Sequence, residues 1–235
     1  MGAGMETPEL GNPSTPVAQR TRAFGQGETL NRLDRLSFWL SCRRIKSVVG
    51  DFAGLRLADI GCGYDAPFAH YVRGRAKSIV VADLAIAPET KRAPGVRAIE
   101  GRLPDCLTAI DDQSIDVVFC NSVIEHLWEP LETLREIFRI CAPGGVAFIN
   151  APAWRAKNLL EFLAFRLGLL PESEIDDHKM YYDPKDLWPL LVRSGFRPKD
   201  LRVFRHKFRF GTLAICRKPH ADATGFRDGR GDGNF

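Results

Sequence analysis

Several features that would place this chain in a special class are absent from its sequence. None of the six cysteines (Cys42, Cys62, Cys106, Cys120, Cys141 and Cys216) belongs to a C-x-x-C pair. This disfavours a zinc site or a disulfide framework and fits a reducing, cytoplasmic environment. The first twenty residues, MGAGMETPELGNPSTPVAQR, contain no apolar core, so a secretory signal is not expected. The hydrophobic content of 45% and the charged content of 26% are ordinary for a globular protein.

Acidic residues are scarce toward the carboxyl end. Residues 193–218 contain many Lys and Arg but a single acid, Asp200, while the whole chain carries a formal net charge of only +4. A solvated face of terminal strands explains such a stretch. An anionic partner, either a lipid surface or a nucleic acid, is the alternative.

The two ends of the chain have low-complexity sequences, and a single domain is expected between them. Residues 1–25 are rich in Gly, Pro, Ser and Thr, and residues 219–235 have the same character, so both are expected to be disordered. The domain then covers 26–218. Within it, short apolar segments alternate with helical patterns, which predicts βαβ units and a parallel sheet. The last two apolar segments, LRVFRHKFRF and GTLAICRK, have no helix between them and are expected to pair antiparallel at one end of the sheet.

The remaining predicted elements follow from periodicity. A leading helix has apolar residues at helical spacing, namely Leu33, Leu36, Leu40 and Ile45. Strands are predicted for LRLADI, SIVVADL, GVRAIEG, SIDVVFCN and VAFINAP, and helices for APFAHYVRG and DPKDLWPLLVRSGF. The segment EPLETLREIFRICAPGG is predicted to be an amphipathic helix. Its apolar side includes Leu131, Leu134, Ile137, Phe138 and Cys141, and Pro143 with Gly144 and Gly145 stops it.

A glycine turn follows the first predicted strand, in LADIGCGYDAPF (57–68). Gly61 and Gly63 let the backbone approach a ligand closely, but their spacing also fits the dinucleotide pattern with Ala66 as its third position. Asp59 distinguishes the ligands, because a carboxylate there would repel a pyrophosphate and suits a cationic amino group. Asp83 closes the second strand, where it can accept hydrogen bonds from both hydroxyls of a ribose.

The chain resembles the class I S-adenosylmethionine-dependent methyltransferases over residues 30–216. The resemblance rests on D-x-G-x-G at 59–63, the acid that closes strand two, the segment DVVFCNSVIEHL and the PGG before strand five. It implies an α/β fold with a seven-stranded, mostly parallel, Rossmann-like sheet, flanking helices and an antiparallel last strand. It also implies S-adenosylmethionine as the cofactor.

The resemblance further implies roles for individual residues. Asp59, Gly61 and Gly63 would hold the methionine end of the cofactor, Asp83 the ribose, and Leu84 the adenine by packing, while Asn121 and Ser122 would line the sulfonium. Arg102 stands near the place where many relatives carry an acid that contacts the adenine. Backbone and packing would therefore hold the adenine here.

The acceptor side is expected in the leading helix and in the insertion 153–182. No Asn-Pro-Pro-aromatic motif follows strand four, which disfavours methylation of adenine N6 or glutamine. The apolar stretch 156–170 is too short to span a bilayer. It suits a lid over an apolar substrate, a helix at a lipid interface, or a helix packed on the core. This region resembles that of the ubiquinone-biosynthesis O-methyltransferases.

Two histidines are candidates for proton transfer. A hydroxyl acceptor profits from a base, and His178 lies among Asp176, Asp177, Tyr181 and Tyr182, where carboxylates can orient its ring. His126, just after strand four, is the second candidate and is expected to line the cofactor pocket. A structural role for either histidine is the alternative, and no metal is expected.

These patterns predict an S-adenosylmethionine-dependent methyltransferase. Its expected acceptor is a small, apolar or lipid-like molecule methylated on oxygen, and its expected location is cytoplasmic or peripheral to a membrane through 156–170. Nucleic acid is not the expected partner. The alternatives are a nucleotide-dependent oxidoreductase, an RNA methyltransferase and a non-catalytic adenosyl-binding protein.

Overall fold

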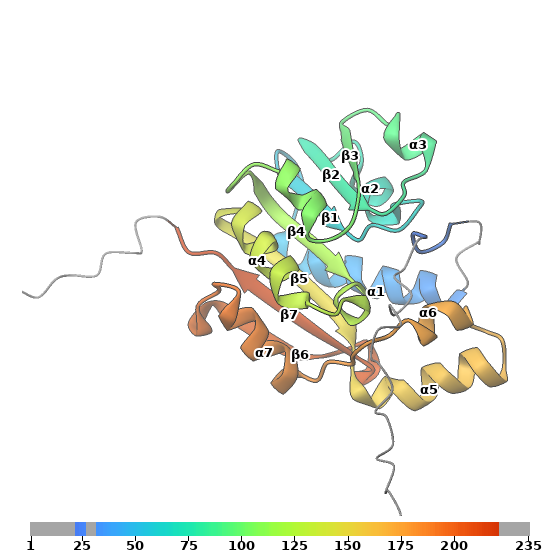
Figure 1. Ribbon diagram of the computed structural model, residues 1–235. Helices are drawn as coiled ribbons and strands as arrows, with labels where there is room; N and C mark the ends of the chain where they lie inside the picture. Colours follow the sequence, from blue (N-terminus) through green and yellow to red (C-terminus); the bar gives the residue numbers. More distant parts are fainter. Residues whose placement is uncertain (1–21, 27–31, 221–235) are drawn as a thin grey trace, which may run out of the picture.

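One seven-stranded sheet organises the molecule (Figure 1). The computed structural model describes residues 22–26 and 32–220. The strand order is β3-β2-β1-β4-β5-β7-β6; neighbours among β1 to β5 pair in parallel, and β7 is antiparallel to β5 and β6. The strands are β1 (Arg56–Ile60), β2 (Ser78–Asp83), β3 (Val96–Glu100), β4 (Ile115–Asn121), β5 (Cys141–Pro152), β6 (Leu201–His206) and β7 (Gly211–Arg217). The predicted fold class is confirmed.

Helices cover both faces of this sheet. They are α1 (Arg32–Val49), α2 (Pro67–Val72), α3 (Pro88–Lys91), α4 (Pro130–Ile140), α5 (Lys157–Glu161), α6 (Glu172–Asp176) and α7 (Pro184–Arg193). Short 3₁₀ turns are η1 (Asp105–Ala109), η2 (Ile124–His126), η3 (Trp154–Ala156) and η5 (Pro198–Asp200). The segment η4 (Phe162–Arg166) is π-helical, and η6 (Lys207–Arg209) is a tight turn with left-handed backbone. Among the residues described, no helix is long and apolar enough to cross a membrane.

Successive strand residues enter two separate cores. Leu57 and Phe119 pack with α1 and α2 on one face, whereas Ala58 and Val118 pack with α4 and α7 on the other. Because both faces are covered, the central strands read as continuous apolar runs. Polar residues within such runs, including Asp59 on β1, are therefore buried.

The predicted end of the helix that follows the fourth strand is wrong. α4 ends at Ile140, and Cys141 already pairs with Ile115 as the first residue of β5. The register then shifts before Val117 pairs with Val146. A Cβ at Gly145 would lie 2.8 Å from the Ala142 carbonyl oxygen, so this glycine serves an irregularity in the strand rather than a helix stop.

The leading helix also packs differently from its predicted pattern. Cys42 and Ile45 are buried, but Leu36 is exposed. The Ser41 hydroxyl donates to Asn121 at the carboxyl end of β4. The part of α1 before Ser41 therefore extends past the strand ends, where Leu36 finds no core to enter.

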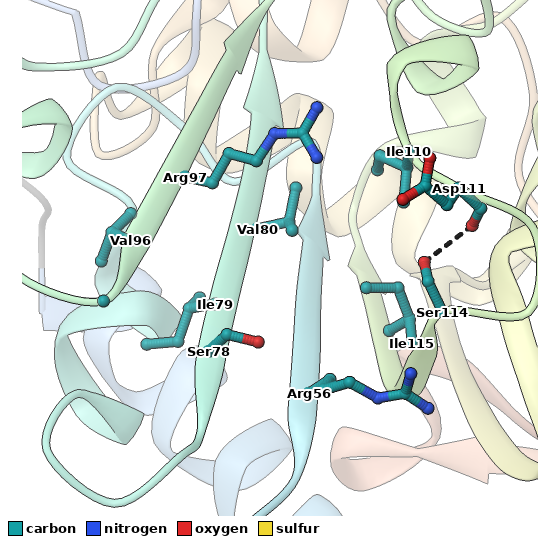
Figure 2. A pocket seen from close by; sticks show the side chains of 11 residues that line it. Arg56, Ser78, Ile79, Val80, Val96, Arg97, Ile110, Asp111, Ser114 and Ile115 are labelled. Atoms are coloured by element: carbon teal, nitrogen blue, oxygen red, sulfur yellow. Dashed lines mark hydrogen bonds between the residues drawn. The ribbon is translucent and has the colours of Figure 1, made fainter.

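A shallow hollow of about 330 Å³ lies at the amino end of the strands (Figure 2). Its lining includes Arg56, Ser78 and Val96, each at the start of a strand. Its polar groups are used locally, since the Ser114 hydroxyl donates to the Asp111 carbonyl oxygen at 2.7 Å. Ligands of open α/β sheets bind outside the opposite, carboxyl ends, so we assign no function to this hollow.

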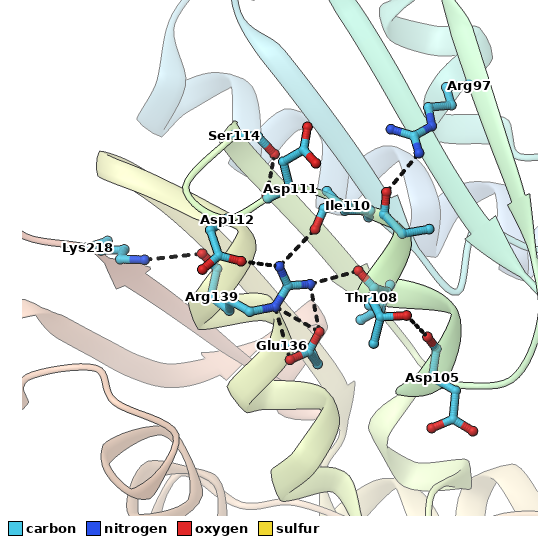
Figure 3. Close-up of polar contacts among 12 residues, drawn as sticks. Arg97, Asp105, Thr108, Ile110, Asp111, Asp112, Ser114, Glu136, Arg139 and Lys218 are labelled. Carbon is cyan, nitrogen blue, oxygen red and sulfur yellow. Dashed lines mark hydrogen bonds and ion pairs between the residues drawn. The ribbon is translucent and has the colours of Figure 1, made fainter.

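Paired charges close the same amino end (Figure 3). Arg139 donates to the carboxylates of Glu136 and Asp112 and to the carbonyl oxygens of Leu107 and Ile110, all within 3.1 Å. Nearby, the Asp116 carboxylate accepts from the guanidinium of Arg56 at 2.7 Å and from its backbone N–H at 2.8 Å. These bonds hold the pKa of Asp116 below its ordinary value.

Candidate functional site

The glycine turn between β1 and α2 leaves no room for a side chain at Gly61 and little room at Gly63. Gly61 and Gly63 have φ values of 69° and 72°, which favour glycine. A Cβ at Gly61 would lie 2.2 Å from Val123 Cγ2, and one at Gly63 would lie 3.3 Å from the Phe24 carbonyl oxygen. The turn therefore forms a backbone cradle, as the sequence predicts for a bound cofactor.

Residues 22–26 pack against this cradle. The Tyr64 backbone N–H donates to the Phe24 carbonyl oxygen at 2.8 Å, and Ala23 is buried. Part of the segment that the sequence assigns to a disordered arm (1–25) therefore belongs to the packed domain. The rest of that arm, and residues 221–235 of the predicted tail, lie outside the described residues.

Asp59 is a buried acid beside the cradle. It is 3% exposed, on β1 between Val81 of β2 and Phe119 of β4. Burial raises its pKa well above the ordinary value, and the charge of Asp83 raises it further. A ligand ammonium group would favour the charged carboxylate. The environment therefore fits the amino group expected at the methionine end of the cofactor.

Asp83 ties the end of β2 to the glycine turn. One carboxylate oxygen accepts from the Gly63 N–H at 2.8 Å, and the other accepts from the Leu84 N–H at 2.7 Å. A carboxylate oxygen can accept more than one hydrogen bond, and the ribose contact of Asp83 stays a prediction. Leu84 is half-buried next to it. Arg102, near the expected adenine position, is exposed.

Asn121 is the centre of a polar cluster at the end of β4. Its Oδ1 accepts from the Asn150 amide at 2.9 Å, from the Ser41 hydroxyl at 3.2 Å and from the Lys207 ammonium at 3.4 Å. The adjacent Ser122 has a φ of 56° and donates its N–H to the Asn150 carbonyl oxygen at 2.7 Å.

The sequence prediction missed Ser41, Asn150 and Lys207. Asn150 carried a usable signal, because it is a polar residue near the end of the apolar strand VAFINAP. Lys207 carried none, since it is one of many basic residues in its region.

The two predicted histidines lie together. The rings of His126 and His178 meet edge to face with centroids 4.8 Å apart, and Tyr181 lies 5.2 Å beyond His178. His126 Nδ1 is 2.9 Å from the Asp177 carboxylate. The sequence predicted Asp177 as a partner that orients His178, and the structure shows it bonded to His126. The insertion folds back onto η2, which brings these residues together: the Lys179 N–H donates to the Glu125 carbonyl oxygen at 2.7 Å.

Asp177 places a carboxylate beside this histidine pair. Burial alone would raise the pKa of Asp177, but hydrogen bonds from His126 and Lys179 lower it to about 2. Glu125, His126 and His178 each present one ligand atom within 4.8 Å of the others. Such a group can exchange protons or hold a metal ion. The expectation that this site works without a metal therefore stays a prediction.

The apolar stretch of the insertion is mainly exposed. In α5 and η4, Ala164 is buried, whereas Phe162 and Phe165 are 51% and 46% exposed. Leu159, Leu167 and Leu169 are exposed as well. Leu160, Leu163 and Leu170 are half-buried. This stretch therefore packs partly on the protein, while its exposed side chains leave an apolar surface that suits a lid or an interfacial helix.

Known proteins are similar to this chain in sequence and in fold. A family model described as a methyltransferase domain matches residues 31–200. A probable S-adenosylmethionine-dependent methyltransferase of Mycobacterium tuberculosis is 30% identical over 190 residues, covering 78% of this chain and 65% of that protein. A ubiquinone biosynthesis O-methyltransferase of Ralstonia nicotianae is 24% identical, covering 69% of this chain and 71% of that protein.

Solved structures support the fold. An S-adenosylmethionine-dependent methyltransferase from Archaeoglobus fulgidus superimposes with a TM-score of 0.57 at 15% identity, covering 75% of this chain and 92% of that one. The cradle, the buried Asp59 and the bridging Asp83 lie where the sequence predicts the S-adenosylmethionine site. The chain thus belongs to the methyltransferase-domain family and is a class I S-adenosylmethionine-dependent methyltransferase.

Proposed function

We propose that this enzyme methylates a hydroxyl oxygen of a small, apolar or lipid-like acceptor. The observation that carries the proposal is the His126–His178 pair. His126 lies in η2, and His178 lies in the insertion that folds back onto η2 and that also contains the exposed apolar stretch. S-adenosylmethionine, when bound, supplies a methyl group on a sulfonium. Asp59, Gly61 and Gly63 hold its methionine end, Asp83 its ribose and Leu84 its adenine, and Asn121 and Ser122 lie near the sulfonium.

In this proposal the two histidines remove the hydroxyl proton of the acceptor or position its hydroxyl group. His178 takes the hydroxyl proton or positions the hydroxyl, as the oxygen gains the methyl group. His126 supports His178 edge-on, and the Asp177 carboxylate at 2.9 Å stabilises positive charge on the pair.

The exposed apolar side chains support an apolar acceptor and a peripheral membrane contact through 156–170. Leu159, Phe162, Phe165, Leu167 and Leu169 expose apolar surface that a lipid interface would cover. The ubiquinone biosynthesis O-methyltransferases, by their name, modify oxygen in the synthesis of a quinone, which favours the same acceptor class.

Transfer of labelled methyl groups to an alkyl-substituted catechol tests the proposed base. We expect His178→Ala to lower kcat by about 100-fold or more, because general base catalysis typically contributes that much. Affinity for S-adenosylhomocysteine should stay unchanged. Each assay is repeated with a chelator to separate proton transfer from a metal effect. Equal turnover by His178→Ala and wild type would refute the assignment.

Sedimentation with phosphatidylglycerol vesicles tests the membrane contact. The double variant Phe162→Ser/Phe165→Ser should lose most of its vesicle binding. Leu36→Ser is the matched control, because Leu36 is similarly exposed but lies on α1. If both variants bind vesicles like the wild type, the interface lies elsewhere or does not exist.

A further inference from the structure

The turn between β6 and β7 has an unusual backbone. Lys207, Phe208 and Arg209 have φ values of 49°, 57° and 72°, the left-handed region that side chains disfavour. Three such residues in a row, none of them glycine, are costly for a turn. Backbone strain of this kind persists where the surrounding structure enforces it, often at functional sites.

The turn places Lys207 inside the polar cluster. Phe208 at its tip is 79% exposed, whereas Lys207 is half-buried with its ammonium 3.4 Å from Asn121 Oδ1. The positive charge of Lys207 also acts on the Cys42 thiol of α1. The pKa of the Cys42 thiol is raised to about 12 by burial and by Asp59, while Lys207 acts in the lowering direction. The cation therefore lies in the same neighbourhood as the buried Asp59.

The contact between Lys207 and Asn121 is easily exchanged. Asn121 Oδ1 receives three donors, although a carbonyl oxygen has two lone pairs, and the Lys207 contact is the longest of the three. A negatively charged oxygen would bind the ammonium more strongly than this shared amide oxygen does.

The charge of the site favours a carboxylate over a phosphate. Asp83 and the buried Asp59 make this end of the sheet acidic, which disfavours a phosphate dianion more than a singly charged carboxylate that pairs with one lysine. Lys207 comes from the β6–β7 side of the sheet. The glycine cradle and Asp83 lie on the opposite side of β4, at β1 and β2.

We propose that Lys207 binds a carboxylate beside the methyl-transfer point. The carboxylate belongs to the acceptor or to the methionine end of the cofactor. In its acceptor form the inference rests on the proposed function. A carboxylate on an otherwise apolar acceptor would fix its orientation while its apolar part lies toward α5 and η4.

Calorimetric titration of Lys207→Met with paired probes distinguishes the two sources. The cofactor pair is S-adenosylhomocysteine and its decarboxylated analogue, which keeps the amine. The acceptor pair, added to protein saturated with S-adenosylhomocysteine, is 3,4-dihydroxybenzoate and catechol. Binding of one carboxylate probe should weaken at least 10-fold, its neutral or decarboxylated partner should be unaffected, and the affected pair identifies the source.

The outcomes that overturn the proposal are equally specific. Unchanged affinity for both carboxylate probes, or an equal loss within each pair, would leave Lys207 without a carboxylate-binding role. Arg209→Met is the matched control, because Arg209 shares the turn and its left-handed backbone but is exposed. Failure of the proposed function would appear separately, as wild-type protein that binds S-adenosylhomocysteine but transfers no methyl group.

A second variant separates binding from folding. Lys207→Gly removes the ammonium and relieves the left-handed strain at this position. We expect its Tm to equal or exceed that of the wild type, while it loses carboxylate affinity as Lys207→Met does. A lowered Tm with unchanged affinity would show that Lys207 serves folding alone, against the proposal.

Discussion

The polar groups at the two ends of the same sheet differ in how fully they are paired within the protein. At the amino end, Arg139 and Arg56 are bonded to carboxylates and carbonyl oxygens, and the pKa of Asp116 is lowered by its partner. At the carboxyl end, Asp59 is buried with a raised pKa, and the Asn150 side-chain oxygen has no hydrogen-bond partner among the described residues.

Backbone strain and exposed apolar side chains are more frequent at the carboxyl end, although Gln113 at the amino end also has a positive φ, of 53°. The left-handed turn Lys207–Arg209 and the exposed Phe162 and Phe165 all lie at or near the carboxyl end, with the predicted site residues. We infer that the amino end contributes stability, whereas the carboxyl end holds groups whose favourable partners are ligands. The predictions below test this division from the largest expected effect to the smallest.

Gly61→Ala should have the largest effect. The new Cβ would overlap Val123 and adopt a left-handed backbone, which together should cost about 3 kcal/mol of unfolding free energy. S-adenosylhomocysteine binding should be lost. Gly54→Ala is the control, since Gly54 has a φ of 76° but no atom near its Cβ position, and should cost only about 1 kcal/mol. Equal losses in urea unfolding would refute the steric explanation.

Asp59→Asn should lower the affinity for S-adenosylhomocysteine by about 10- to 100-fold, because a charge-assisted hydrogen bond to the ligand amine is lost. The ligand-free variant should be more stable than the wild type at neutral pH. Because the folded pKa is raised, ionising Asp59 costs stability as the pH rises above the ordinary aspartate value. A less stable variant with unchanged affinity would contradict a binding role.

Arg139→Met should lower the unfolding free energy by about 1–2 kcal/mol, because two carbonyl oxygens and two carboxylates lose their donor. Affinity for S-adenosylhomocysteine should not change, since these contacts lie at the amino end. Urea unfolding and calorimetry measure the two quantities on one preparation. A large affinity loss would break the proposed division.

Asp116→Asn should have the smallest effect, a loss of stability at neutral pH without a change in affinity. Its folded pKa is lowered, so its contribution is present above the ordinary aspartate pKa and disappears as the pH falls through the folded value. The difference between variant and wild type in urea unfolding should therefore shrink in acid. A difference that grows in acid would have the wrong sign.

Local signals made much of the fold predictable, and they also carry the prediction of the cofactor site. Each strand is a short apolar segment, and Asp59, Gly61 and Asp83 are recognised from their places at strand ends. The end of α4 was not predictable, because Cys141 follows an apolar helical pattern yet is held by the β4 register. The pairing of His126 with Asp177 and of Lys207 with Asn121 joins residues 51 and 86 positions apart. Such contacts depend on how the insertion and the last hairpin fold back.

Hydrogen–deuterium exchange with and without S-adenosylhomocysteine tests the division most directly. The account predicts slower exchange on ligand addition at 59–64, 83–86 and 121–123, around the cradle, Asp83 and Asn121. Exchange around Asp112, Asp116 and Arg139 at the amino end should stay unchanged. Protection centred on the amino-end hollow, or no protection at the carboxyl ends of β1, β2 and β4, would contradict the account.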